Sequence, residues 1–221
     1  MATWMIHFRV ADALLRRLEE EIPDREAFVF GNVAPDCGIP DESGMNYTPP
    51  RAVSHFGKAG ERDYDRFFSA YYFHAKERDE QSFFLGYYSH LLTDDEWVNR
   101  ILYPKYERFG GEFADFASFT AVMRNEWTEL DRRYIRDHPS LFSYALFGRI
   151  SPEKNHLLPH FPEDAFAVQL ERIRSFYRIL PTGGELRYAD EQSLDIFVRE
   201  CADVLEQKLR KALAGEVSIC G

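Results

Sequence analysis

Two side chains that can bind a metal ion lie four residues apart in residues 83–97, FFLGYYSHLLTDDEW. In a helix, His90 and Asp94 project from one face about one turn apart, so an imidazole and a carboxylate can reach the same cation. Phe83 and Tyr87 share that stripe, which indicates that the face points inward. A buried carboxylate needs a partner. The partner is either His90 itself, in a satisfied core pair, or a metal ion.

Three further candidates lie outside this helix. His7 falls on the apolar face of the first predicted helix, Asp36 follows a proline in the loop sequence GNVAPD, and His55 opens HFG after a proline-rich segment. Each also has an ordinary interpretation: a hydrogen-bonded core histidine, an Asx turn or helix cap, and a loop residue. Gly86, one turn before His90, removes a side chain where the helix needs a close neighbour or an ion.

The elements that must position these residues are predicted to be helical. Apolar residues at helical spacing predict helices over residues 3–22, 63–76, 80–102 (closed by Pro104), 112–137, 140–147, 163–180 and 189–214. The apolar run 28–30 is too short to type, and prolines and glycines argue against regular structure in 31–50 and 151–162. We therefore expect an all-α, irregular multi-helix bundle, one domain over residues 1–221, with two long loops at one end over the metal site.

Charge and cysteine content exclude several functions. The net charge of -10 opposes binding to a nucleic-acid polymer or an acidic membrane. Cys37, Cys201 and Cys220 show no CxxC spacing, which is typical of free thiols in a reducing compartment. No apolar run approaches a transmembrane segment or a signal peptide. We expect a cytoplasmic protein, and its oligomeric state is not indicated.

The order His, Asp, His, then His-x-x-x-Asp resembles the zinc-dependent phospholipase C family and, more distantly, the S1/P1 nuclease group. The segments WMIHFRVADALL, FVFGNVAPD, VSHF and LGYYSHLLTDD carry the resemblance, which covers nearly half of the chain. It is closest to the short intracellular bacterial branch of that family.

The resemblance implies a set of metal ligands. By its pattern, Asp36, His55, His90 and Asp94 bind one zinc ion, and His7 binds a second that shares Asp94. Secreted members of the family complete the second site with the amino group and carbonyl of an N-terminal tryptophan. Trp4 is not terminal in this sequence. The second site therefore needs another ligand or is weaker.

The family holds a further zinc ion with two histidines and a glutamate. The candidates here are His138, His156 and His160, with Glu153 or Glu163 as the carboxylate. Their spacing departs from the family pattern, so exposed loop histidines are the default interpretation.

Nitrogen and oxygen ligands suit Zn²⁺, and also manganese, iron or nickel. Two such ions roughly 3.5 to 4 Å apart would hold a bridging hydroxide and polarise a phosphoryl oxygen. We therefore predict a metal-dependent phosphoric ester hydrolase acting on a phosphodiester or phospholipid-like substrate. For an acidic protein, a soluble phosphomonoester or phosphodiester is at least as plausible.

Individual roles follow from this chemistry. Asp94 would bridge or orient the ions, and Asp36 would act as a general base. Arg51 and Lys58 flank His55 and either meet substrate oxygens or are solvated. Tyr47, with residues 38–50, would form one wall of the pocket. The alternatives are an HD-type metal phosphohydrolase, whose adjacent His-Asp pair is absent, and a non-catalytic helical protein with a structural metal.

Overall fold

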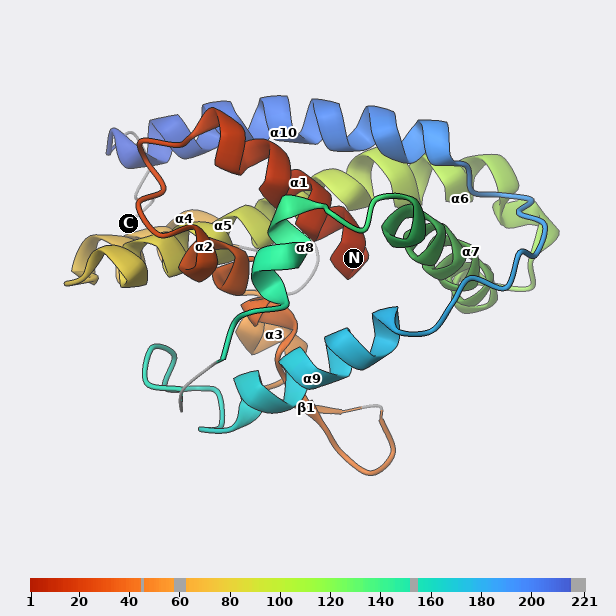
Figure 1. The fold of residues 1–221 in the computed structure, drawn as a ribbon. Helices are drawn as coiled ribbons and strands as arrows, with labels where there is room; N and C mark the ends of the chain where they lie inside the picture. The colour runs from red at the N-terminus through yellow and green to blue at the C-terminus, as the bar shows by residue number, and fades with distance from the viewer. Residues whose placement is uncertain (45, 58–62, 152–154, 216–221) are drawn as a thin grey trace.

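The computed structural model describes residues 1–44, 46–57, 63–151 and 155–215, and these residues are mostly helical (Figure 1). The α-helices are α1 (Trp4–Arg17), α2 (Arg25–Gly31), α3 (Arg51–Ser54), α4 (Tyr64–Tyr71), α5 (Arg78–Trp97), α6 (Tyr103–Phe109), α7 (Phe116–Asp137), α8 (Phe142–Phe147), α9 (Ala165–Tyr177) and α10 (Glu191–Leu213). Shorter helical turns are η1 (Ala34–Asp36), η2 (Tyr72–His74), η3 (Val98–Leu102) and η4 (Gly110–Glu112). The predicted all-α, multi-helix fold is confirmed.

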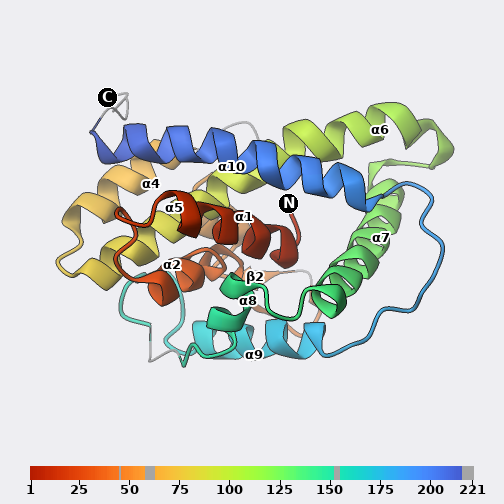
Figure 2. The ribbon, with the colours of Figure 1, turned by 45° about the horizontal axis from the view of Figure 1, so that its top comes forward.

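Helix α5 is the central element of the bundle. It packs against α1, α2, α4 and α10, and Figure 2 shows α10 lying along one side of the molecule beside α1. Every residue of α5 from 82 to 94 is buried, which is typical of a helix surrounded by other elements. His90 and Asp94 are therefore enclosed by protein rather than set on a solvated face.

Helices α2 and α5 touch backbone to backbone at two glycines. A Cβ atom on Gly86 would lie 2.1 Å from the carbonyl oxygen of Phe28, and one on Gly31 would lie 1.9 Å from that of Phe83. Both distances are far below van der Waals contact, so only glycine fits at either position. The close neighbour expected at Gly86 is thus helix α2, not an ion. This contact brings Asn32, just after α2, against α5.

Polar side chains fix where several helices begin. The hydroxyl or carboxylate of the residue before the helix accepts a backbone N–H of the first turn. These capping residues are Thr3 for α1, Asp24 for α2, Asp63 for α4, Asp115 for α7 and Asp190 for α10. The prediction for the first helix was too long at its end, because α1 stops at Arg17 and turns follow.

Pro104 does not end the helical path, contrary to the prediction. The chain continues from α5 through η3, a π-helical turn in which the Tyr103 N–H bonds to the Val98 carbonyl, into α6. Proline lacks an N–H and its ring collides with the preceding turn of an α-helix. The wider π-turn just before it accommodates that ring. The helical path consequently reaches Phe109.

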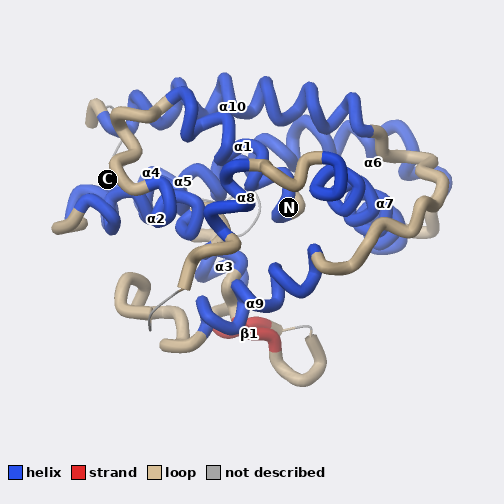
Figure 3. The backbone as a smooth tube through the Cα atoms, viewed as in Figure 1, coloured by secondary structure: helices blue, strands red, loops and turns tan. Residues whose placement is uncertain are grey.

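The loop predicted over residues 31–50 contains regular structure. Asp36 lies on the 3-10 turn η1, and strands β1 (Ile39–Pro40) and β2 (Tyr47–Thr48) form an antiparallel pair. Figure 3 marks β1 in red at the bottom of the view. The run 28–30, left untyped from sequence, belongs to α2. In the second predicted loop, the described residues 151 and 155–162 form no helix or strand, as expected.

Two glutamates on α7 hold the connection between α9 and α10. Glu126 accepts the backbone N–H groups of residues 187–189, and Glu129 accepts those of Thr182 and Gly183. Burial raises the pKa of Glu129, but these hydrogen bonds outweigh it and lower the pKa to about 2. The carboxylates therefore fix the α9–α10 connection to α7. Both α7 and α9 contribute residues to the pocket described below.

The thiols of Cys37 and Cys201 are free, as predicted, and both are buried, whereas Cys220 lies outside the described residues. No helix in the described part of the chain has the length and apolar character needed to cross a membrane.

Candidate metal centre

The structure brings the five predicted side chains together from four elements. His7 comes from α1, Asp36 from η1, His55 from the end of α3, and His90 and Asp94 from α5. All five side chains are at most 6% exposed. The stacked rings of His7 and His90 have centroids 3.8 Å apart.

The distances between these groups are those of ligands that share a cation. Asp94 Oδ1 lies 3.5 Å from His7 Nε2, and Asp94 Oδ2 lies 3.6 Å from His55 Nε2 and 3.9 Å from His90 Nε2. His55 Nε2 is also 3.5 Å from Asp36 Oδ1. Two ligands of one tetrahedral zinc ion lie roughly 3.3 Å apart, given metal–ligand bonds of about 2.0 Å. These contacts are longer than good hydrogen bonds and close to that separation.

Five buried polar atoms in this cluster have no hydrogen-bond partner within the described residues. They are Nδ1 and Nε2 of His7, Nε2 of His55, Nε2 of His90 and Oδ2 of Asp94. Leaving one buried group unpaired costs about 1–3 kcal/mol. One ring nitrogen of each histidine and Oδ2 of Asp94 meet in this cluster, and their lack of hydrogen-bond partners is consistent with binding to divalent cations. The alternative of a satisfied core pair does not fit, because His90 and Asp94 form no hydrogen bond with each other.

A backbone carbonyl orients His90 toward the cluster. The ring Nδ1 lies 2.8 Å from the carbonyl oxygen of Asn32, which can only accept, so Nδ1 carries the proton. Burial, and then the charge of His7, lowers the pKa of His90 to about 3. The ring is therefore neutral near pH 7, and Nε2 presents a lone pair to the centre. His55 is oriented similarly, with Nδ1 2.9 Å from Ser54 Oγ.

Asp94 has an oxygen on each side of the cluster. Its Oδ1 faces His7 and accepts the backbone N–H of Ala2 at 2.9 Å, whereas Oδ2 faces His55 and His90. Burial raises the pKa of Asp94, but the neighbouring histidines outweigh it, and the pKa lies below its ordinary value. Asp94 is thus ionised and placed to contact two ions at once.

Asp36 is held by two donors outside the cluster. The indole N–H of Trp4 donates to Oδ2 at 2.9 Å, and the guanidinium of Arg51 donates to Oδ1 at 2.7 Å. Burial raises the pKa of Asp36, but His55 and the charges of His90 and Arg51 outweigh it and leave the pKa well below 3.8. Arg51 thus pairs with Asp36 while its side chain stays about half exposed, and Lys58 lies outside the described residues.

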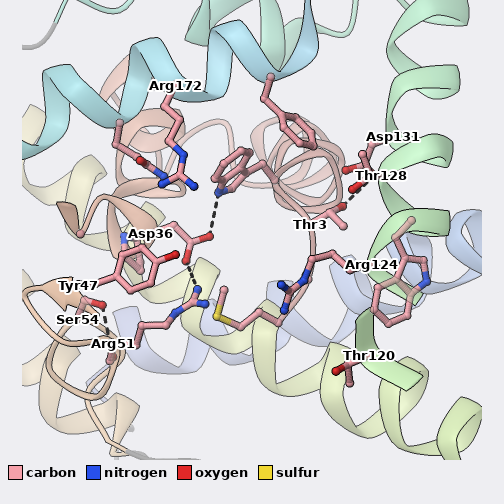
Figure 4. A pocket seen from close by; sticks show the side chains of 18 of the residues that line it. Thr3, Asp36, Tyr47, Arg51, Ser54, Thr120, Arg124, Thr128, Asp131 and Arg172 are labelled. Carbon is pink, nitrogen blue, oxygen red and sulfur yellow. Dashed lines mark hydrogen bonds and ion pairs between the residues drawn. The ribbon is translucent and has the colours of Figure 1, made fainter. Parts of the chain in front are cut away.

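A pocket of about 480 Å³ opens beside the centre, with Asp36 and Trp4 in its lining (Figure 4). Tyr47 and other residues of the loop expected to form one wall do line it. The other side comes from α7 and α9, two helices that no motif in the sequence connects with the site. Their polar contributions are Thr120, Arg124, Thr128, Asp131, Gln169 and Arg172.

Among the described residues, none of the candidates for a further zinc site belongs to a group of three close ligand atoms. His138 is exposed, with Nδ1 3.0 Å from the Tyr134 carbonyl, and His156 is exposed. His160 is half-buried against Phe56, and burial lowers its pKa. Within the described residues, the groups of three ligand atoms that lie close together are His7 with His90 and Asp94, and Asp36 with His55 and His90. Glu153 lies outside the described residues.

Comparison with models of known protein families, with curated proteins and with solved structures found no match. The fold and the site by themselves define an all-α protein with a buried cluster of three histidines and two aspartates beside a pocket.

Proposed function

We propose that this protein binds divalent cations, with Zn²⁺ as the first candidate, at the centre formed by His7, Asp36, His55, His90 and Asp94, and that it hydrolyses a phosphoric ester. The observation that carries the proposal is the cluster of buried, unpaired nitrogen and oxygen atoms of His7, His55, His90 and Asp94 beside a pocket. The resemblance to the zinc-dependent phospholipase C family supports the same chemistry.

The two sides of Asp94 suggest two cation positions. Asp36, His55 and His90 with Asp94 Oδ2 would hold one ion, and His7 with Asp94 Oδ1 would hold the other. Trp4 is the first residue of α1 and follows Thr3, so its nitrogen is a peptide nitrogen and offers the second position no amino ligand. We therefore propose that the ion beside His7 is bound more weakly.

The residues of this centre would hold divalent ions, which would supply Lewis acidity toward a phosphoryl oxygen and lower the pKa of a water. The protein would contribute positioning. Arg51, which contacts Asp36 at the pocket, is placed to donate to a phosphoryl oxygen. Asp36 is poorly suited to the predicted role of general base, because both of its carboxylate oxygens already accept hydrogen bonds, from Trp4 and Arg51. We instead assign it the roles of ligand and anchor for Arg51.

The pocket favours catalysis over a purely structural metal. Structural zinc sites are closed by protein ligands, whereas catalytic sites keep a position open toward a substrate. Here Asp36 lies at once in the cluster and in the lining of a pocket large enough for a small molecule. A small phosphodiester, phosphomonoester or phospholipid headgroup is the proposed substrate class.

Metal analysis and an ester screen test this function together. Protein purified without chelator is analysed for metal and assayed on phosphomonoesters and phosphodiesters with added zinc, manganese or nickel. We expect bound metal and hydrolysis that EDTA removes, with both lost in His90→Ala. The matched control is His74→Ala, an exposed histidine on η2 outside the cluster. Bound metal without hydrolysis would favour a structural metal, and a metal-free, inactive protein would overturn the proposal.

A further inference from the structure

Three arginines from three different elements point into the pocket. Arg51 comes from α3, Arg124 from α7 and Arg172 from α9, and Figure 4 shows their side chains directed toward the same space. Arg51 is paired with Asp36. Arg124 and Arg172 form no ion pair or hydrogen bond with any described residue.

The pocket gathers positive charge although the whole protein is negatively charged, with 37 acidic and 27 basic side chains. The acidic residues of the pocket lining do not neutralise Arg124 and Arg172. Asp36 is engaged by Arg51 and Trp4, and Asp131 accepts hydrogen bonds from Thr3 and Tyr177. Two guanidinium groups therefore remain available to a ligand, and the planar fork of arginine matches carboxylate and phosphate oxygens.

We propose that Arg124 and Arg172 bind a second anionic group of the substrate, a phosphate or carboxylate separate from the phosphoryl group at the metal centre. The inference rests on the proposed phosphoester hydrolysis. It narrows the substrate class to small phosphoesters that carry a second anionic group besides the reacting phosphoryl group. The pocket volume of about 480 Å³ suits a ligand of that size.

A cationic headgroup is the rival occupant. Aromatic rings of Trp4, Tyr47, Trp127 and Phe176 line the pocket, and such rings can hold a quaternary ammonium group. Arg124 and Arg172 line the same pocket, however, and would repel a second cation there. The charges thus favour a soluble phosphoester with a second anionic group over a choline-type phospholipid.

Binding of matched ligands tests the inference independently of turnover. Benzylphosphonates with a carboxylate, a methyl or a trimethylammonium group at the para position differ mainly in charge. Their affinities for the metal-loaded full chain are measured by calorimetry. We expect the carboxylate ligand to bind at least about tenfold more tightly than the other two, the gain typical of a charged hydrogen bond.

The variants assign that preference to the two arginines. Arg124→Gln with Arg172→Gln should bring the three affinities within about twofold of one another, with metal content and thermal transition unchanged. The matched control, Arg66→Gln with Arg149→Gln, removes the same charge from exposed arginines outside the pocket and should keep the preference. Equal affinities in the unmodified protein, tighter binding of the ammonium ligand, or a preference that survives the double variant would each overturn the inference.

Hydrolysis of the corresponding aryl phosphates separates this inference from the proposed function. Turnover of all three esters with equal kcat/KM would contradict anion selectivity and leave the hydrolase proposal standing. Absence of any turnover, combined with arginine-dependent binding of the carboxylate ligand, would contradict the hydrolase proposal and support the anion site.

Discussion

The indole N–H of Trp4 joins the first helix to Asp36 through a 2.9 Å hydrogen bond. Trp4→Phe keeps an aromatic ring and removes that donor. Residues that orient metal ligands typically change metal affinity by about 10- to 100-fold. We expect Trp4→Phe to bind zinc at least about tenfold more weakly, measured by competition with a chelator of known affinity.

The control is Trp127→Phe, because the Trp127 indole N–H has no hydrogen-bond partner within the described residues. Its zinc affinity should match that of the unmodified protein. Equal affinities in all three proteins would show that Trp4 does not position Asp36.

Asp131 makes a second prediction at the residue scale, concerning pH. Burial raises its pKa to about 7 despite hydrogen bonds from Thr3 and Tyr177 and the nearby charge of Arg9. The folded protein therefore holds this proton more tightly than the unfolded chain. The stability contributed is fully present below about pH 3.8 and is lost as pH rises through about 7.

Asp131→Asn should not show this loss. Its free energy of unfolding, compared with that of the unmodified protein, should rise by a few kcal/mol at most between about pH 4 and pH 7 and then level off. Urea unfolding across that range measures the difference. Asp137→Asn, at an exposed residue whose pKa is lowered, serves as the control and should show no such gain. Parallel curves for Asp131→Asn and the unmodified protein would contradict the raised pKa.

Spacing in the sequence identified part of the site and could not identify the rest. His90 and Asp94 are recognisable because helical geometry alone places residues four apart on one face. Arg124, Asp131 and Arg172 carry no local signal, since they reach the pocket only through the packing of α7 and α9. Whether the five clustered side chains bind metal stays a prediction.

At the scale of elements, glycines at the crossing of α2 and α5 let α2 pack closely against α5, the helix that carries His90 and Asp94. Gly86→Ala would place a Cβ atom 2.1 Å from the Phe28 carbonyl, so the two helices would have to separate. We expect a loss of roughly 2 kcal/mol or more in the free energy of unfolding, as for other overpacked cores.

Gly111→Ala is the matched control, because a Cβ atom there meets nothing within 4 Å. It should change stability by no more than about 0.5 kcal/mol, as exposed substitutions usually do. Chemical denaturation compares the two variants, and equal stability of Gly86→Ala and Gly111→Ala would mean that the crossing is not tightly packed.

Helical periodicity predicted the main helices of this fold, but the position of a proline was a poor guide to where one of them ends. The aromatic pattern before Trp97 correctly marked α5, because its apolar residues must be buried. Pro104 was misread as a stop, since a sequence does not show that a π-turn accommodates the ring. The β1–β2 pair escaped prediction because strands of two residues leave no alternation to detect.

At the scale of the whole molecule, the metal centre should contribute to stability. The unpaired atoms of His7, His55, His90 and Asp94 are buried at the meeting point of α1, α3 and α5. A ligand that binds only the folded state stabilises it by about 2.7 kcal/mol when present at a hundred times its Kd. We expect EDTA to lower the thermal transition of the protein and added zinc to restore it.

His90→Ala provides the comparison for this measurement. Its transition should start lower and respond little to EDTA. An EDTA-insensitive transition in the unmodified, metal-analysed protein would indicate that the cluster contributes no metal-dependent stability.

The carbonyl that aims His90 belongs to the main chain of Asn32, not to a side chain. No single codon change at position 32 can delete that acceptor, since all twenty amino acids carry it. Substitutions at position 32 therefore change the tautomer of His90 only if they also move the backbone at the end of α2. Changing the tautomer of His90 by design will therefore require a different backbone path at the end of α2.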